Sequence, residues 1–195
     1  MTTILHIISS PRQAQSYSTG LGNTIVRKLM RDDNTLIERD LTRDNPPFLS
    51  PEQTLALYKR PELHTEEERR SFGYSDRVIG ELREADVIVI DTPTHNLGIA
   101  ASLKAWLDQI VRIGASFTYT ETGTRIGLLT GKKVYLAIAS GGSPSKLDFI
   151  EPYLRAVLEI VGITDIQTLR IDKTIERELS KTDYEGICTD FPAGR

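Results

Sequence analysis

The chain has 195 residues, of which 39% are hydrophobic and 26% are charged, and its net charge is -3. These values are typical of a globular protein, and they exclude a collagen-like repeat or an extensively disordered chain. No apolar stretch approaches the roughly 20 residues that a membrane-spanning helix needs, so we expect no membrane span. One domain over residues 1–195 is expected, because about 100 to 200 residues is the ordinary size of a single core.

Charge and cysteine content narrow the partners and the compartment. Acidic and basic residues are mixed along the chain without a basic stripe, which argues against nucleic acid binding. Cys188 is the only cysteine and there are three histidines, so we expect neither a disulfide nor a metal site. The start, Met1 to Ile8, lacks a basic region and its apolar run is too short for a signal peptide. We therefore expect a cytoplasmic protein.

Apolar runs typical of buried strands recur along the chain, at residues 4–8, 36–41, 87–91, 134–139 and 166–171. Between them, apolar residues three or four apart predict helices around residues 21–29, 78–82, 103–111 and 154–161. Strands that alternate with helices indicate a parallel sheet, because a parallel connection needs a crossover. We expect an α/β fold: a flavodoxin-like, doubly wound, five-stranded parallel sheet of order 2-1-3-4-5 with helices on both faces.

Two insertions interrupt this pattern. Residues 45–72 contain four prolines and many charges, which predicts a loop with short helices. Residues 116–129, with Phe117 and Tyr119, alternate in a way that indicates a hairpin, and we expect it to project over the edge where the strands end. Both insertions are candidate lids or dimer contacts.

In a doubly wound sheet, ligands bind beyond the carboxyl ends of the strands. The segments that follow the first, third and fourth predicted strands are residues 9–18, 92–99 and 140–146. The first is rich in hydroxyls and precedes a helix, whose unpaired N–H groups favour an anion, so this loop can hold one phosphate. Ser16 and Ser18 are equally ordinary turn and cap residues, and the loop alone leaves both interpretations open.

The other two segments suit a flat ring system such as a flavin. Backbone amides, the Asn96 side chain and Leu97 would supply hydrogen bonds and an apolar floor, and His95 is expected to pack against the ring. The alternative is a plain βα turn with Asn96 as a helix cap. Gly141 and Gly142 would let the backbone approach a planar ligand, although a simple glycine turn explains the same pair.

Two other glycine patterns do not fit known phosphate loops. Gly20 and Gly22 resemble the start of a dinucleotide fingerprint, but the third glycine is missing and the segment lies inside a predicted helix. Gly127 to Lys133 is one residue short of a P-loop, with Lys133 where Ser or Thr should stand. We therefore predict neither a dinucleotide fold nor a nucleotide triphosphatase.

Taken in chain order, several segments resemble one family over nearly the full length: Pro93-Thr94-His95-Asn96-Leu97, Leu103-Lys104, Asp108, Arg112, Gly114, Phe117, Tyr119-Thr120-Glu121, Thr130-Gly131-Lys132-Lys133, Pro152-Tyr153-Leu154 and Gly162-Ile163-Thr164-Asp165. The chain is similar to the FMN-dependent NADH azoreductase and NADH:quinone oxidoreductase family. The resemblance implies a homodimer with one FMN per subunit at the interface. It also implies a ping-pong cycle in which NADH or NADPH reduces the flavin at N5 and a quinone or azo acceptor then takes its place.

The same resemblance assigns residues to the ligand, and no protein side chain is required as a catalytic group because flavin N5 carries the hydride. The expected phosphate and ribityl contacts are Ser10, Ser16, Tyr17 and Ser18. The expected ring contacts are Thr94, His95, Asn96 and Leu97, and those at the pyrimidine end are Ala139, Ser140, Gly141 and Gly142. Phe117 is expected to line the acceptor pocket, where an aromatic ring suits a flat substrate.

The chain departs from the family at two of these places. Members often read Met-Tyr-Asn-Phe where this chain has Thr94-His95-Asn96-Leu97, and Ser-Arg where it has Ala139 and Ser140. An alternative function is a flavodoxin-like electron carrier without a small-molecule acceptor, although such carriers are usually strongly acidic around the flavin. A receiver-type signalling domain would need acidic residues after the first strand, where Ser9 and Ser10 stand instead.

Overall fold

The computed structural model describes residues 1–57, 59–143, 148–176 and 179–189. Within these residues, five parallel strands form one sheet: β1 (Thr3–Ile8), β2 (Thr35–Asp40), β3 (Val87–Pro93), β6 (Lys133–Ala139) and β7 (Asp165–Ile171). Their order is β2-β1-β3-β6-β7, which is the expected 2-1-3-4-5 when the strands of this sheet alone are counted. All five predicted strands and their order are therefore confirmed.

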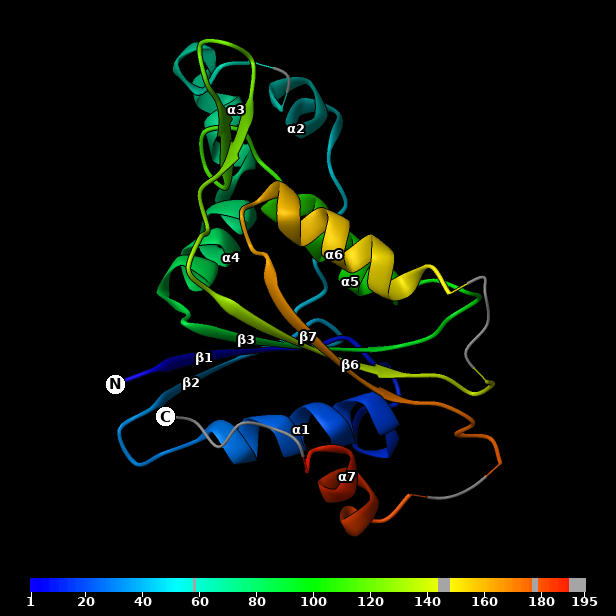
Figure 1. Cartoon of the computed structure of the whole chain (residues 1–195). Coiled ribbons are helices and arrows are strands. Elements are labelled where there is room, and N and C mark those ends of the chain that lie inside the picture. The colour runs from blue at the N-terminus through cyan, green and yellow to red at the C-terminus, as the bar shows by residue number, and fades with distance from the viewer. Residues whose placement is uncertain (58, 144–147, 177–178, 190–195) are drawn as a thin grey trace.

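Helices cover both faces of the sheet (Figure 1). On one face lie α4 (Gly73–Glu84), α5 (Ala101–Ile110) and α6 (Ile150–Ile160), and on the other lie α1 (Tyr17–Leu29) and α7 (Lys181–Ile187). Alternate strand residues explain the two layers, because Leu5 packs with α4 to α6 whereas Ile4 packs with α1. In the described part of the chain, no helix is both long and apolar enough to cross a membrane.

The insertions form a projection that we call the arm. It consists of α2 (Pro51–Ala56), the 3-10 helix η2 (Pro61–Leu63), α3 (Glu66–Ser71) and the antiparallel hairpin of β4 (Phe117–Tyr119) and β5 (Arg125–Gly127). These elements stand together above the face that carries α4 to α6 (Figure 1). The predicted short helices and the predicted hairpin are both confirmed.

The direction of the hairpin differs from the expectation. The Leu129 N–H donates to the Val161 carbonyl at 2.8 Å, and Val161 follows α6 at the amino ends of the strands. The hairpin thus starts near the amino ends of the strands, at the opposite edge of the sheet from the carboxyl ends of β1, β3 and β6. The two ends of strands of this length lie about 20 Å apart. The expectation that it projects over the carboxyl edge of its own sheet is wrong, because α5 carries the chain back before the hairpin begins.

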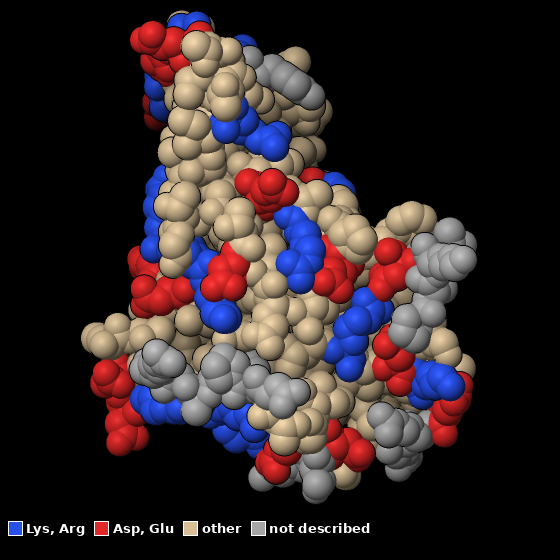
Figure 2. Space-filling model, in the orientation of Figure 1, with Lys and Arg blue, Asp and Glu red and all other residues tan. Residues whose placement is uncertain are grey.

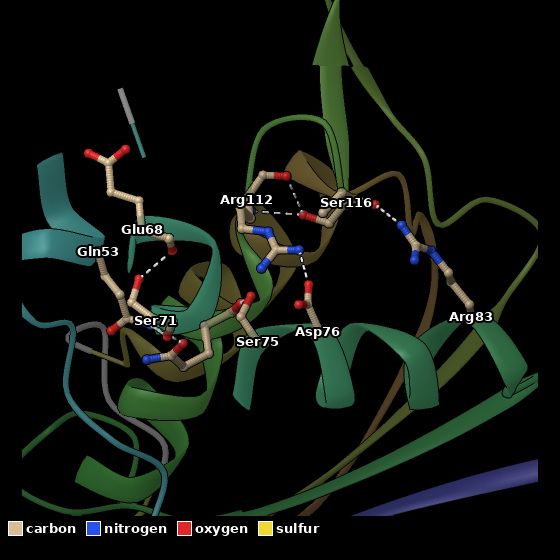
Figure 3. A network of polar contacts seen from close by, with 10 residues as sticks. Gln53, Glu68, Ser71, Ser75, Asp76, Arg83, Arg112 and Ser116 are labelled. Atoms are coloured by element: carbon tan, nitrogen blue, oxygen red, sulfur yellow. Dashed lines mark hydrogen bonds and ion pairs between the residues drawn. The ribbon is translucent and has the colours of Figure 1, made fainter. Parts of the chain in front are cut away.

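A polar network fixes the base of the arm (Figure 3). Gln53 Nε2 donates to the Ser71 carbonyl at 2.6 Å and lies 3.4 Å from Gln109 Oε1. Gln109 in turn donates to the Pro47 carbonyl at 3.0 Å, and its own carbonyl accepts from Ser75 Oγ at 2.6 Å. Because Gln109 lies in the last turn of α5, its bond to Pro47 places the start of the first insertion away from the carboxyl edge as well. The arm is therefore anchored to α4 and α5.

Arg112 lies at the base of the arm, just before the hairpin. Its guanidinium forms an ion pair with Asp76 and lies 4.6 Å from the centre of the Phe72 ring. Gly114 adopts a positive φ of 74°, and a Cβ there would lie only 2.5 Å from Pro61 Cγ. The two insertions thus contact each other directly, and glycine is required at this contact.

Tyr74 at the foot of α4 gives the fold a predicted dependence on alkaline pH. Burial and the neighbouring Asp44 carboxylate raise the pKa of Tyr74 to about 12. Tyrosine in the unfolded chain ionises near pH 10. The contribution of neutral Tyr74 to the stability of the fold is therefore complete below pH 10, and it is lost as the pH rises towards 12. Between these limits the wild-type free energy of unfolding should fall by about 1 kcal/mol more than that of Tyr74→Phe, after allowance for solvent screening. Denaturant unfolding of both proteins across this range measures the difference.

Candidate functional site

Three loops meet at the carboxyl edge of the sheet, and they are the three that the sequence singled out. The Thr94 N–H donates to the Ala139 carbonyl at 2.8 Å, which joins the loop after β3 to the end of β6. Ser9 Oγ donates to the Asp91 carbonyl at 2.7 Å, which joins the loop after β1 to β3. The structure therefore brings together the predicted residues of segments 10–18, 94–97 and 139–142, whereas Phe117 of the same chain lies at the other edge.

The loop after β1 is a polar turn that leads into α1. Ser16 is the N-cap of α1: its Oγ accepts from the Thr19 N–H at 3.2 Å and lies 3.1 Å from Ser18 Oγ. The cap interpretation of Ser16 is thus confirmed. Ser10 is also buried, and its Oγ has no partner among the residues that the structure describes. Buried hydroxyls without partners are rare, so Ser10 Oγ is suited to form a hydrogen bond with a ligand at this edge.

The loop after β3 is a strained two-residue turn. His95 and Gly98 exchange two backbone hydrogen bonds of 2.9 Å, and the two residues between them have positive φ angles, 49° at Asn96 and 68° at Leu97. Positive φ at both central positions defines a type I′ turn, which usually contains glycine. A leucine in this region costs about 1 to 2 kcal/mol. Strain of this kind clusters at ligand sites, and Leu97 is also 49% exposed.

This turn does not cap the following helix. Helix α5 begins at Ala101, its N-cap is Ala100, and that cap makes no side-chain hydrogen bond. The alternative interpretation of Asn96 as a helix cap is therefore wrong, and its side chain is exposed at the edge. Thr94, just before the turn, has a buried Oγ1 without a partner in the described part of the chain. A second unsatisfied hydroxyl thus lies at the same edge as that of Ser10.

The loop after β6 is held in place by the segment that follows β7. The Ser140 N–H donates to the Ile171 carbonyl at 2.8 Å, and the Lys173 N–H donates to the Gly142 carbonyl at 2.9 Å. A Cβ on Gly141 would approach the Ile175 side chain at 3.2 Å, whereas one on Gly142 would meet no described atom within 4 Å. Gly142 therefore presents backbone to open space. Residues 144–146 of the predicted loop lie outside the described residues.

Two features of the site were not predicted. The Arg12 guanidinium lies 5.8 Å from the centre of the Tyr17 ring, which places a positive charge beside the loop after β1. Below the same loop, the buried Asp91 carboxylate accepts hydrogen bonds from Ser9 and Thr19. The sequence does show Asp91 as an acidic residue at the end of an apolar strand. Its hydrogen-bond partners could not be predicted, because they are far away in the sequence.

Comparisons with known proteins agree with this geometry. A family model described as a flavodoxin-like fold matches residues 2–185. An FMN-dependent NADH:quinone oxidoreductase from Mesorhizobium japonicum is 40% identical over 177 residues, which cover 87% of this chain and 84% of the relative.

Proteins of known structure give the same result. An azoreductase from Bacillus anthracis strain Sterne superposes with a TM-score of 0.81 at 26% identity, over 97% of this chain and 94% of that one. An FMN-dependent NADH-azoreductase from the Ames Ancestor strain, solved in complex with FMN, also gives a TM-score of 0.81, at 25% identity and with 96% of each chain covered. The chain therefore belongs to the family of FMN-dependent NADH:quinone oxidoreductases and azoreductases, which have the flavodoxin-like fold.

Proposed function

We propose that this protein is an FMN-dependent NAD(P)H oxidoreductase that reduces quinones and azo compounds. The observation that carries the proposal is the pair of buried hydroxyls, Ser10 Oγ and Thr94 Oγ1, that lack partners among the described residues. They lie in two different loops at one edge of the sheet, beside a strained turn and a helix N-terminus. A ligand with a phosphate at one end and a hydrogen-bonding ring at the other satisfies both.

The residues present fit FMN in three groups. Ser10, Ser16, Tyr17 and Ser18 would hold the phosphate and ribityl chain, together with the first N–H groups of α1. Thr94, His95, Asn96 and Leu97 would contact the ring, and Ala139, Ser140, Gly141 and Gly142 would face its pyrimidine end. The positive charge of Arg12 supports an anion at the first of these groups.

The chemistry needs little from the protein beyond binding and shielding. Bound FMN would supply two-electron transfer from the reduced nicotinamide to the acceptor. The side chains of this edge would orient the ring and exclude water from the stacked donor or acceptor. The names of the relatives support NADH as donor, and we extend the proposal to NADPH. A cytoplasmic location fits the single cysteine, Cys188, which suits a reducing compartment.

We also propose a homodimer, because one chain does not bring all of the expected residues together. Phe117 is the expected acceptor contact, yet its hairpin starts at the opposite edge of its own sheet. A twofold partner would place the arm of one subunit beside the carboxyl edge of the other. Exposed apolar side chains on the arm support this arrangement, including Leu63 at 66% and Tyr119 at 52% exposure.

Two measurements test the proposed class. The purified protein should be yellow and should release FMN when it is denatured. It should also oxidise NADH in the presence of a soluble quinone, with initial-rate plots that remain parallel as the quinone concentration changes, as a ping-pong cycle requires. An electron carrier would bind FMN but would not turn over NADH with the quinone, and that outcome would favour the alternative function.

The ring turn gives a more local prediction. Asn96→Gly removes the only side-chain amide of the turn while it keeps a residue that tolerates positive φ. We expect the affinity for FMN to fall by about 2- to 10-fold, as for one lost hydrogen bond between uncharged groups. Titration of the apoprotein with FMN measures this loss. Asn96→Ala would remove the same amide and would also add backbone strain. A difference in thermal stability between the two variants therefore measures the effect of the backbone strain separately from the loss of the amide.

A further inference from the structure

A histidine and an aspartate are buried together between the sheet and α1. His6 lies on β1 and Asp91 on the neighbouring β3, and both side chains are fully buried. His6 Nε2 is 3.0 Å from Asp91 Oδ2. An ionised carboxylate only accepts, so the histidine donates in this bond. This pair lies in the layer where Ile4 and Val89 supply the apolar contacts to α1.

The Asp91 carboxylate also bonds to two other elements. Its Oδ1 accepts from the Ser9 N–H at 3.2 Å and from Thr19 Oγ1 at 3.3 Å. The Asp91 backbone carbonyl accepts from Ser9 Oγ at 2.7 Å. One residue of β3 thus fixes the loop after β1 and the first turns of α1 at the same time.

Helix α1 leaves space for the pair by having glycine at position 22. A Cβ on Gly22 would lie 2.8 Å from His6 Nε2 and 3.0 Å from Asp91 Oδ2. Glycine in a helix interior costs about 1 kcal/mol relative to alanine. The close approach of α1 to the pair is therefore maintained at a cost in helix stability.

Stability is a weak explanation for this arrangement. Two buried polar side chains are often no more stable than apolar residues of the same volume, because both lose their hydration. The partners of Asp91 indicate a different role. Ser9 adjoins Ser10 and Thr19 adjoins Ser18, two of the residues proposed to hold the phosphate, and Thr94 of the ring turn lies three residues beyond Asp91.

We propose that Asp91, held by His6, is a positioning residue that fixes the phosphate-binding loop and the start of α1 relative to the ring-binding turn. This inference rests on the proposed function, because it assumes that FMN occupies the edge. The hydrogen bond from His6 also satisfies the second oxygen of the buried carboxylate, so both of its oxygens are held in place. Asp91 therefore sets the preference of the site for phosphorylated over unphosphorylated flavin.

The test compares the dissociation constants of FMN and riboflavin, which differ by the phosphate, for the apoprotein and its variants. Asp91→Ala removes every contact of the carboxylate, and we expect the preference for FMN over riboflavin to fall about tenfold or more. Asp91→Asn keeps an oxygen acceptor for Ser9 and Thr19, and the other tautomer of His6 can accept from its amide. This conservative variant should keep the preference within about threefold of wild type.

Thr19→Val provides a second, milder variant if Asp91→Ala does not fold. It removes one hydroxyl bond to Asp91 and nearly preserves side-chain volume, so the FMN preference should fall by about threefold while riboflavin affinity is unchanged. A wild-type preference for FMN that persists in Asp91→Ala, or in Thr19→Val where the first variant is unfolded, overturns the inference alone. Equal wild-type affinity for the two flavins overturns both the proposed phosphate loop and the inference.

Discussion

The double variant Ser16→Ala/Ser18→Ala should lose affinity for FMN by about 100-fold or more, because hydrogen bonds to a charged phosphate contribute about 1.5 to 3 kcal/mol each. Its affinity for riboflavin, which lacks the phosphate, should change far less. The two hydroxyls lie 3.1 Å apart at the N-terminus of α1, where unpaired N–H groups also favour an anion. Titration of the apoprotein with each flavin gives both affinities.

The control for this variant must account for the helix cap. Ser16→Ala removes the N-cap of α1, which lowers stability by about 1 kcal/mol on its own. Ser50 caps α2 on the arm in the same way, as its side chain accepts from the Gln53 N–H. Ser50→Ala should therefore reproduce a loss of helix capping without any effect on flavin selectivity. Equal losses of FMN and riboflavin affinity in the double variant would contradict a phosphate site at this loop.

Separation of the proposed dimer should abolish NADH:quinone turnover. Ile126→Asp places a charge on an exposed apolar side chain of the hairpin, which belongs to the arm at the top of Figure 2. A buried charge without a partner costs several kcal/mol at an interface, so we expect a monomer and a loss of turnover of about 100-fold or more. Light scattering gives the mass of the variant, and NADH oxidation gives its activity.

Dilution of the wild-type protein tests the same dependence without a substitution. Activity per subunit should fall at the concentration where light scattering begins to report monomers, because the arm of the partner no longer covers the carboxyl edge. The matched control for Ile126→Asp is Leu36→Asp, because Leu36 is an exposed apolar residue of the edge strand β2 rather than of the arm. A monomer that retains its flavin and full turnover would contradict the proposed role of the partner.

The sheet was predictable because its strands are covered on both faces. Runs such as Val87 to Ile90 and Val134 to Ala139 are continuously apolar, and the structure buries nearly all of these residues. Helices α1, α4, α5 and α6 followed from apolar residues with helical spacing. Helix α7 was missed, since it has only seven residues, although Ser180 and Asp183 form a capping box that the sequence displays.

The candidate site was predictable as three loops but not as a geometry. Strand order decides that the loops after β1, β3 and β6 meet, and the pattern of the sequence was sufficient for that order. The positive φ angles of Asn96 and Leu97 were not predictable, because neither residue is glycine and the neighbouring structure imposes the turn. His6 and Asp91 are 85 residues apart, so local patterns could not reveal their contact.

The direction of the hairpin also could not be predicted from local sequence patterns. Its strands, Phe117–Tyr119 and Arg125–Gly127, were visible as an alternating pattern, but an alternating pattern carries no information on direction. The direction depends on where α5 ends and on the contact between Gly127 and Gly162, where a Cβ on Gly127 would lie 2.1 Å from the Gly162 nitrogen. Long-range packing therefore decides to which edge Phe117 belongs.

The most direct test of the proposed function separates the two halves of the reaction. The protein loaded with FMN is mixed with NADH in the absence of oxygen, and its yellow absorbance is followed in a stopped-flow instrument. We predict that the absorbance disappears at a rate at least as high as the steady-state turnover, and that a soluble quinone added afterwards restores it. A protein whose flavin is not reduced by NADH, or is reduced but not reoxidised by the quinone, would contradict the assignment as an NADH:quinone oxidoreductase.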